Sequence, residues 1–123
     1  MLAEKTAAPL ALGRWASYGI AYMSVVTASE LLVGVERADT AERRALRGAF
    51  VENLLAAIPV LEFSVPVART HARMLAALPK SATVGAHDAL IAATAVHHGH
   101  ALLTRNAKDF RLFAGLTVEE FLI

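Results

Sequence analysis

Short apolar runs alternate with longer amphipathic segments along the whole chain. Apolar residues that recur every three or four positions predict helices, and short runs rich in β-branched residues predict strands. On these criteria we expect helices over residues 2–16, 28–37, 39–58, 64–78 and 87–98, with a turn and a short helix over 106–113. We expect strands over residues 20–26, 59–63, 101–104 and 116–118. Because short strands separated by helices favour a parallel sheet flanked by helices on both faces, the pattern predicts a three-layer α/β fold in a single domain, residues 1–123.

Residues with capping chemistry mark several of the expected helix ends. Thr27, Asp39 and Ser64 each stand where a helix N-cap is needed, and Glu30 completes a capping box with Thr27. Gly99 directly follows the apolar segment over 87–98, as a C′ residue does.

The composition is that of a folded protein. The chain has 123 residues, of which 56% are hydrophobic and only 19% charged, so intrinsic disorder is excluded. So much apolar surface exceeds what one small core can hide, and we therefore expect a subunit interface. Cysteine is absent, which excludes disulfides, thiolate metal ligands and a cysteine nucleophile. Since no uncharged stretch reaches the ~20 residues of a membrane span, we expect a soluble, cytoplasmic protein.

The net charge of +1 is uninformative, but the charges are unevenly distributed. Residues 69–111 hold only two acidic residues against six basic ones: Arg69, Arg73, Lys80, Arg105, Lys108 and Arg111. A basic segment of this kind is either an ordinary solvated surface or a set of contacts to phosphates.

Three acidic residues lie near the ends of expected elements, in segments otherwise almost free of charge: Glu30, Asp88 and Asp109. Each one alone has a local explanation, as part of a capping box, as a carboxylate in the first turn of a helix, or as a turn residue. Ligand sites in parallel α/β sheets gather at the carboxyl ends of the strands, so we also expect the three to share a pocket. Clustered carboxylates need a cation, and Mg²⁺ or Mn²⁺ prefers their oxygens. Such an ion can polarise a phosphodiester and activate water.

Three segments, taken in order, resemble the later motifs of PIN-domain proteins: Ser24–Gly34 (SVVTASELLVG), Asp88–Ala95 (DALIAATA) and Leu103–Phe110 (LTRNAKDF). The resemblance covers the chain from about residue 10 and is closest to VapC-type toxins, the ribonuclease halves of type II toxin–antitoxin pairs. It implies a PIN-like fold and Mg²⁺- or Mn²⁺-dependent hydrolysis of RNA phosphodiester bonds. It also implies a homodimer and a cognate antitoxin whose tail covers the active-site groove.

The same resemblance assigns roles by position. Glu30, Asp88 and Asp109 become the catalytic acids that hold the metal or its waters, and Thr104 and Asn106 become secondary polar groups of the pocket. Contacts to RNA are expected from basic and imidazole side chains nearby: His87, Arg105, Lys108, Arg73 and Lys80.

The chain departs from the family pattern at its start. PIN domains open with a central strand that carries a first catalytic aspartate, whereas residues 1–5 have the character of the helix that follows it. We therefore expect that the first strand is missing and that the chain is truncated by roughly 15 to 20 residues relative to the family. Glu4, on a helix, would replace that aspartate poorly.

The remaining chemistry-bearing residues have more ordinary interpretations. His97, His98 and His100 are a conceivable zinc cluster, but Gly99 ends the helix between them, and imidazoles near a helix C-terminus interact favourably with its dipole. Aromatic residues near the strand over 20–26 can stack on bases but more often belong to a core: Trp15, Tyr18 and Tyr22.

Three functions follow from these observations. The first is a toxin ribonuclease. The second is a PIN-like binding protein that dimerises and binds antitoxin or RNA without cleavage. The third is a structural helical protein in which the three carboxylates are caps only.

Overall fold

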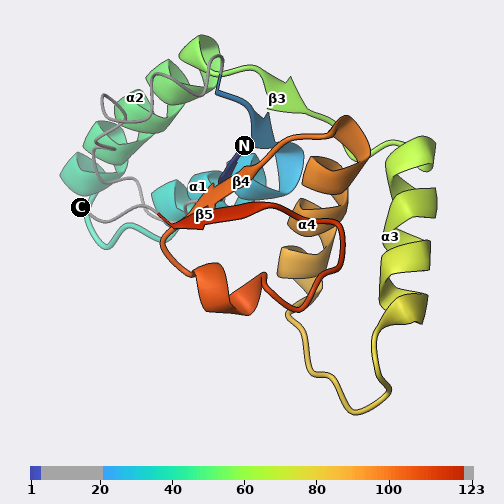
Figure 1. Ribbon diagram of the computed structural model, residues 1–123. Coiled ribbons are helices and arrows are strands. Elements are labelled where there is room, and N and C mark those ends of the chain that lie inside the picture. Colours follow the sequence, from blue (N-terminus) through green and yellow to red (C-terminus); the bar gives the residue numbers. More distant parts are fainter. Residues whose placement is uncertain (4–20, 121–123) are drawn as a thin grey trace.

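The computed structural model describes residues 1–3 and 21–120 (Figure 1). Five short strands form one sheet in the order β3-β2-β1-β4-β5, and every neighbouring pair is parallel. The strands are β1 (Leu2–Ala3), β2 (Met23–Ser24), β3 (Val60–Leu61), β4 (Leu102–Thr104) and β5 (Val118–Glu120). The predicted α/β class with short parallel strands is therefore confirmed.

The start of the chain corrects the sequence analysis. Leu2–Ala3 is the central strand, with Leu2 opposite Met23 of β2 on one side and Leu103 of β4 on the other. The expectation that a helix begins at residue 2 and that the central strand is missing is thus wrong. The backbone of residues 2 and 3 gains sheet pairing on both sides, and this outweighs the modest helix preference of Leu and Ala. The rest of the helix expected over 2–16 lies outside the described residues, as does Glu4.

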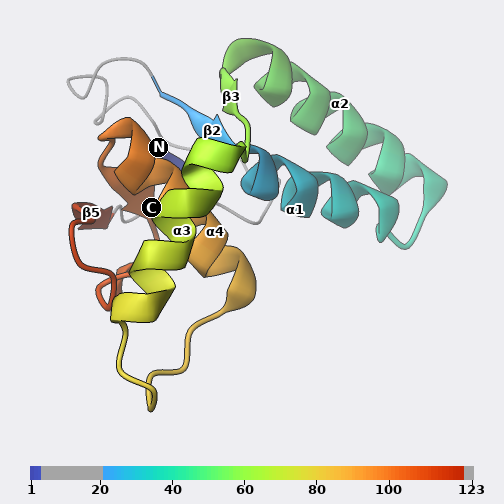
Figure 2. The same cartoon turned by 90° about the vertical axis from the view of Figure 1, so that its right-hand side faces the viewer.

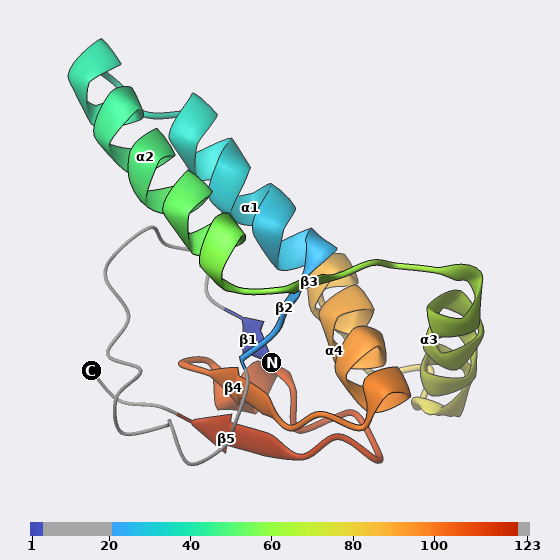
Figure 3. The same cartoon turned by 90° about the horizontal axis from the view of Figure 1, so that it is seen from above.

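The described residues also form four α-helices: α1 (Val25–Glu36), α2 (Ala41–Ala57), α3 (Val65–Ala77) and α4 (Ala86–His98). A 3₁₀-helix, η2 (Ala107–Asp109), follows β4. Helices α1 and α2 pack side by side as a hairpin that projects away from the strands (Figures 2 and 3). Helix α4 lies between the strands and α3 (Figure 3). None of the helices in the described segments is long and apolar enough to cross a membrane.

The boundaries of α2, α3 and α4 lie within two residues of the predictions, whereas α1 begins earlier and η2 is shorter than expected. Helix α1 begins two residues before Thr27, because the Ser24 hydroxyl accepts the hydrogen bond from the Thr27 N–H at 3.1 Å. Helix α2 is capped by Thr40, and the neighbouring Asp39 pairs with Arg43 on the surface instead. Ser64 is the N-cap of α3, and Gly99 ends α4 with a φ of +69°, both as predicted.

Two apolar clusters hold the elements together. The first joins α4 to the segment after β4, and its members are Ala89, Ile91, Ala92, Ala95, Leu102, Phe110 and Phe113. The second joins β2 to the α1–α2 hairpin, and its members are Met23, Ala28, Leu31, Val35, Val51 and Ile58. Because α4 presents mostly alanines, it can approach its neighbours closely, and this fixes the position of its N-terminal turn.

Candidate active site

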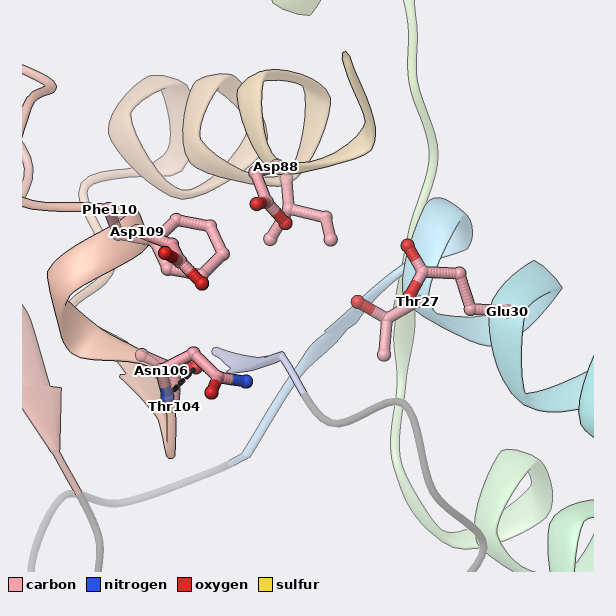
Figure 4. Close-up of a pocket in the computed structure, with 8 residues that line it drawn as sticks. Thr27, Glu30, Asp88, Thr104, Asn106, Asp109 and Phe110 are labelled. Atoms are coloured by element: carbon pink, nitrogen blue, oxygen red, sulfur yellow. Dashed lines mark hydrogen bonds between the residues drawn. The ribbon is translucent and has the colours of Figure 1, made fainter. Parts of the chain in front are cut away.

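A small cavity of about 20 Å³ lies where α1, α4 and η2 meet (Figure 4). Its lining combines carboxylates, hydroxyls and an amide with two apolar side chains: Thr27, Glu30, Asp88, Ile91, Thr104, Asn106, Asp109 and Phe110. The three acids predicted to share a pocket are all present, although 58 residues separate Glu30 from Asp88 and 21 separate Asp88 from Asp109. Thr104 and Asn106, which the family resemblance implied as pocket residues, lie in the same lining.

The topology explains why these side chains meet. Ser24 ends β2 and Thr104 ends β4, and both strands pair in parallel with β1. The carboxyl ends of the three strands therefore lie at one edge of the sheet, where α1 begins and where the segment leading to η2 leaves the sheet. Helix α4 presents its own N-terminal turn to the same place.

Glu30 lies in α1 with only 12% of its side chain exposed. Its Oε1 lies 3.2 Å from Nδ1 of His87, a residue in the first turn of α4 whose side chain is 65% exposed. The imidazole expected to contact RNA is therefore in contact with a pocket carboxylate and connects α1 to α4.

Asp88 lies in the first turn of α4, the helix whose N-cap is Gly85. A Cβ at Gly85 would lie 3.0 Å from Oδ2 of Asp88, which is closer than side-chain carbons ordinarily come. The absence of a side chain at Gly85 thus makes room for the carboxylate. In Figure 4 the carboxylates of Asp88 and Asp109 are both directed into the space between α4 and η2.

A tight turn after β4 sets the far wall of the cavity. The hydroxyl of Thr104 is fully buried and accepts a hydrogen bond from the Asn106 N–H at 3.0 Å, drawn as the dashed line in Figure 4. This bond holds Asn106 at the cavity and leads the chain into η2, which carries Asp109.

Thr27 is a site residue that the sequence analysis missed, because it was assigned as an N-cap. The side chain is 1% exposed, and its hydroxyl points into the cavity (Figure 4). Its position three residues before Glu30 could have identified Thr27 as a cavity residue, since residues three apart on a helix share a face. Ile91 and Phe110 supply the apolar walls.

The residues expected to contact RNA fall into two groups. Arg105 and Lys108 are exposed and flank Asn106 and Asp109 in sequence, beside the cavity. Arg73 instead lines a separate cavity of about 240 Å³ near the end of α3 and donates to the Thr70 hydroxyl at 3.3 Å. Lys80 is exposed in the loop after α3 and does not line the acidic cavity.

The histidines near the end of α4 make three different sets of contacts. His97 Nδ1 lies 3.2 Å from the Thr70 hydroxyl, and the His98 ring meets that of His97 edge-on. His100 stacks on Tyr22 with ring centroids 4.8 Å apart. Trp15 and Tyr18 lie outside the described residues.

The donor set of the cavity suits a hard divalent cation in kind. It consists of oxygen ligands, and the buried Oγ1 of Thr27 has no hydrogen-bond partner among the protein groups described. Within residues 1–3 and 21–120, no three His, Asp or Glu side chains are close enough to hold an ion by themselves. Mg²⁺ is ordinarily bound by one or two carboxylates and keeps several waters, so a lining that contains three acids is compatible with such an ion.

Comparison with known proteins defines the class. The family model described as the PIN domain matches residues 1–116, nearly the whole chain. The order of the motifs, the parallel sheet and the shared acidic cavity agree with that match. The chain belongs to the PIN-domain family.

Relatives narrow the class further. The ribonuclease VapC1 of Rickettsia felis is 42% identical over 106 residues, which cover 85% of this chain and 79% of that protein. A member of the VapBC family of toxin–antitoxin systems from Mycobacterium tuberculosis, VapBC-5, superposes with a TM-score of 0.69 at 33% identity, over 83% of this chain and 81% of that one. Within the PIN family, the chain is a VapC-type ribonuclease, the toxin component of a toxin–antitoxin system.

A third comparison supports the fold alone. The structure of VapBC2 from Rickettsia felis, bound to a DNA fragment from its promoter, superposes with a TM-score of 0.79. Its sequence is 21% identical, and the match covers 89% of this chain and 81% of that one. The arrangement of short parallel strands and helices is therefore shared by proteins whose sequences have diverged widely.

Proposed function

We propose that this chain is a metal-dependent endoribonuclease in which Glu30, Asp88 and Asp109 hold Mg²⁺ or Mn²⁺ directly or through water. The observation that supports the proposal most strongly is that α1, α4 and η2 each contribute one carboxylate to the same small cavity. Three capping carboxylates in a structural protein would have no reason to converge.

A bound ion would polarise the scissile phosphate and lower the pKa of a coordinated water. The protein's own residues position the catalytic groups, exclude bulk water and accept the proton. Glu30 is held at the cavity by His87, and Asn106 is held there by Thr104. Ile91 and Phe110 exclude bulk water from one side, which strengthens electrostatic interactions inside the cavity. Carboxylate oxygens within hydrogen-bonding distance of a water orient it and accept its proton.

The exposed cations Arg105 and Lys108 are placed to bind the phosphates on either side of the scissile bond. Neighbouring phosphates are the dominant electrostatic feature of RNA, and each Lys or Arg contact releases counterions. His87, 65% exposed at the first turn of α4, lies at the same face. Arg73 and Lys80 extend the basic surface toward α3 and serve a longer RNA.

Partners are proposed on two grounds. The relatives of known structure include VapBC proteins, so a cognate antitoxin is the expected partner of this chain. The α1–α2 hairpin exposes four large apolar side chains, Val25, Leu32, Val33 and Leu46, at 40%, 38%, 42% and 73%. These suit an interface, and we propose that the chain forms a homodimer and acts on RNA in the cytoplasm.

Cleavage of a labelled single-stranded RNA tests the proposal. We expect cleavage with Mg²⁺ or Mn²⁺ and none with EDTA, and we expect Glu30→Gln, Asp88→Asn and Asp109→Asn each to abolish it. Glu52→Gln is the matched control, because Glu52 is an exposed acid on α2 remote from the cavity. Full activity of Asp88→Asn in the presence of metal would refute the assignment.

A second candidate function is binding of RNA or antitoxin without cleavage. The observation that favours it is that no three acidic or imidazole side chains in the described part of the chain are close enough to hold an ion unaided. A gel-shift measurement on the same RNA separates the two. Retained binding with no metal-dependent cleavage would support the second function.

A further inference from the structure

Within residues 1–3 and 21–120, the threonine hydroxyls that are buried are hydrogen-bonded, with one exception. Thr94 donates to the Leu90 carbonyl at 2.8 Å, and Thr70 donates to the Pro66 carbonyl at 3.4 Å. The hydroxyl of Thr104 accepts from the Asn106 N–H. Thr27 is as buried as Thr94, yet its Oγ1 has no partner among the protein groups described.

The local backbone explains the exception. Thr94 and Thr70 lie inside helices, where the carbonyl four residues back is within reach of the hydroxyl. The residue four positions before Thr27 is Met23, which belongs to strand β2 and not to a helical turn. The Thr27 N–H is already bonded to the Ser24 hydroxyl. The hydroxyl is left without a local partner, and burying it in that state is unfavourable.

The Thr27 hydroxyl is directed toward a space in which it can find a hydrogen-bond partner. It points into the acidic cavity, toward the space that the carboxylates of Asp88 and Asp109 also face (Figure 4). The cavity volume of about 20 Å³ exceeds the roughly 10–15 Å³ that one water molecule requires. A buried water needs two to four polar partners, and this lining offers a hydroxyl, carboxylates and an amide.

We propose that Thr27 binds one ordered water in this cavity and orients it toward the substrate phosphate. The Thr27 hydroxyl donates to the water oxygen, and the water donates its hydrogens to the carboxylates. The second lone pair of the water oxygen then faces the substrate phosphate. In the hydrolysis this oxygen bonds to phosphorus, the bond to the leaving oxygen breaks, a carboxylate takes the water proton, and solvent protonates the leaving oxygen. The catalytic role of this water rests on the proposed function, whereas the existence of the water site does not.

Two substitutions at residue 27 and one control test the inference. Thr27→Val keeps the shape and removes the hydroxyl, while Thr27→Ser keeps the hydroxyl. Thr94→Val is the matched control, since Thr94 is equally buried and its hydroxyl is bonded to the Leu90 carbonyl. Crystal structures should show a water within about 2.7–3.2 Å of Oγ1 in the wild type and in Thr27→Ser, and none there in Thr27→Val.

Kinetics supply the second measurement. Thr27→Val should lower kcat on the order of tenfold, the equivalent of one hydrogen bond, with KM for RNA unchanged. Thr27→Ser should recover most of the kcat that Thr27→Val loses, Thr94→Val should keep the wild-type kcat, and thermal melts establish that all variants fold. A wild-type structure without water at Oγ1, or an unchanged kcat in Thr27→Val, would overturn the inference. If the wild type cuts no RNA, the proposed function fails, while the electron density at Thr27 still decides the water site.

Discussion

Nδ1 of His87 lies 3.2 Å from Oε1 of Glu30, so the first turn of α4 is connected directly to α1 at a carboxylate that lines the acidic cavity. This contact couples two helices that belong to different apolar clusters. The imidazole is mostly exposed, whereas the carboxylate is mostly buried. His87 therefore orients Glu30 more than it stabilises the fold.

If Glu30 holds the metal as proposed, His87→Ala should lower the rate of RNA cleavage about tenfold, the lower range for residues that orient a metal ligand. The unfolding free energy should change by less than about 1 kcal/mol, because one partner of the pair is exposed. His87→Asn should recover most of the rate, since its amide nitrogen can occupy the position of Nδ1. Single-turnover cleavage and chemical denaturation measure the two quantities. An unchanged rate in His87→Ala would show that the contact has no role in catalysis.

Gly85 offers a way to move Asp88 without mutating it. The backbone at Gly85 has a φ of −66°, which alanine adopts freely, but the new Cβ would lie 3.0 Å from Asp88 Oδ2. We predict that Gly85→Ala displaces the carboxylate by a few tenths of an ångström and lowers the cleavage rate on the order of tenfold. Its unfolding free energy should change by less than about 1 kcal/mol, because loss of unfolded-state entropy opposes the poorer N-cap.

The matched control for that variant is Gly34→Ala. Gly34 lies inside α1, and nothing lies within 4 Å of the position its Cβ would take. Gly34→Ala should raise the unfolding free energy by roughly 0.5–1 kcal/mol and leave the cleavage rate unchanged. Equal losses of rate in the two variants would refute the role of Gly85.

Ser24 caps the helix that carries two cavity residues. Its hydroxyl accepts from the Thr27 N–H at 3.1 Å inside the protein, and Ser24→Ala should cost about 1 kcal/mol of unfolding free energy. Because the first turn of α1 holds Thr27 and leads to Glu30, we also predict a lower kcat. Ser64→Ala is the control, since Ser64 caps α3 in the same way but lines no part of the acidic cavity. A stability loss in both variants with a kcat loss in neither would contradict the prediction.

Local patterns were sufficient to predict α4 and its place in the site. The small apolar residues before Gly99 identify the helix, and Gly99 itself, with φ at +69°, ends it. Asp88 could be assigned to the first turn of α4 because both signals are local. The convergence of the acids was predictable because parallel strands share a carboxyl edge, which depends on topology and not on side-chain detail.

Long-range pairing was the part that local patterns could not supply. Leu2 and Ala3 favour a helix by composition, but they pair with β2 on one side and β4 on the other and so form the central strand. Thr27 was assigned as a cap because nothing in the sequence shows that β2 is only two residues long. The placement of Arg73 away from the acidic cavity depends on how α3 packs on α4, which the sequence alone does not specify.

The stability of the protein should depend on pH through His100. This residue follows Gly99, donates its N–H to the Ala95 carbonyl at 2.9 Å, and stacks its ring on Tyr22. Burial lowers the pKa of His100 below its usual value of 6.5, and the positive charges of the Met1 ammonium and His98 lower it further. The unfolded chain therefore binds a proton at this residue more readily than the folded chain does, and stability falls as the pH drops below about 6.5.

His100→Phe isolates this contribution, because phenylalanine keeps a ring against Tyr22 and does not titrate. We predict that the wild type loses more unfolding free energy than His100→Phe when the pH falls from about 7.5 to about 5.5, and that their difference is constant above about pH 7.5. Urea denaturation at a series of pH values measures the difference, and an NMR titration of the His100 imidazole gives its pKa directly. Parallel stability curves for the two proteins, or a pKa at or above 6.5, would show that burial of the ring does not control its protonation.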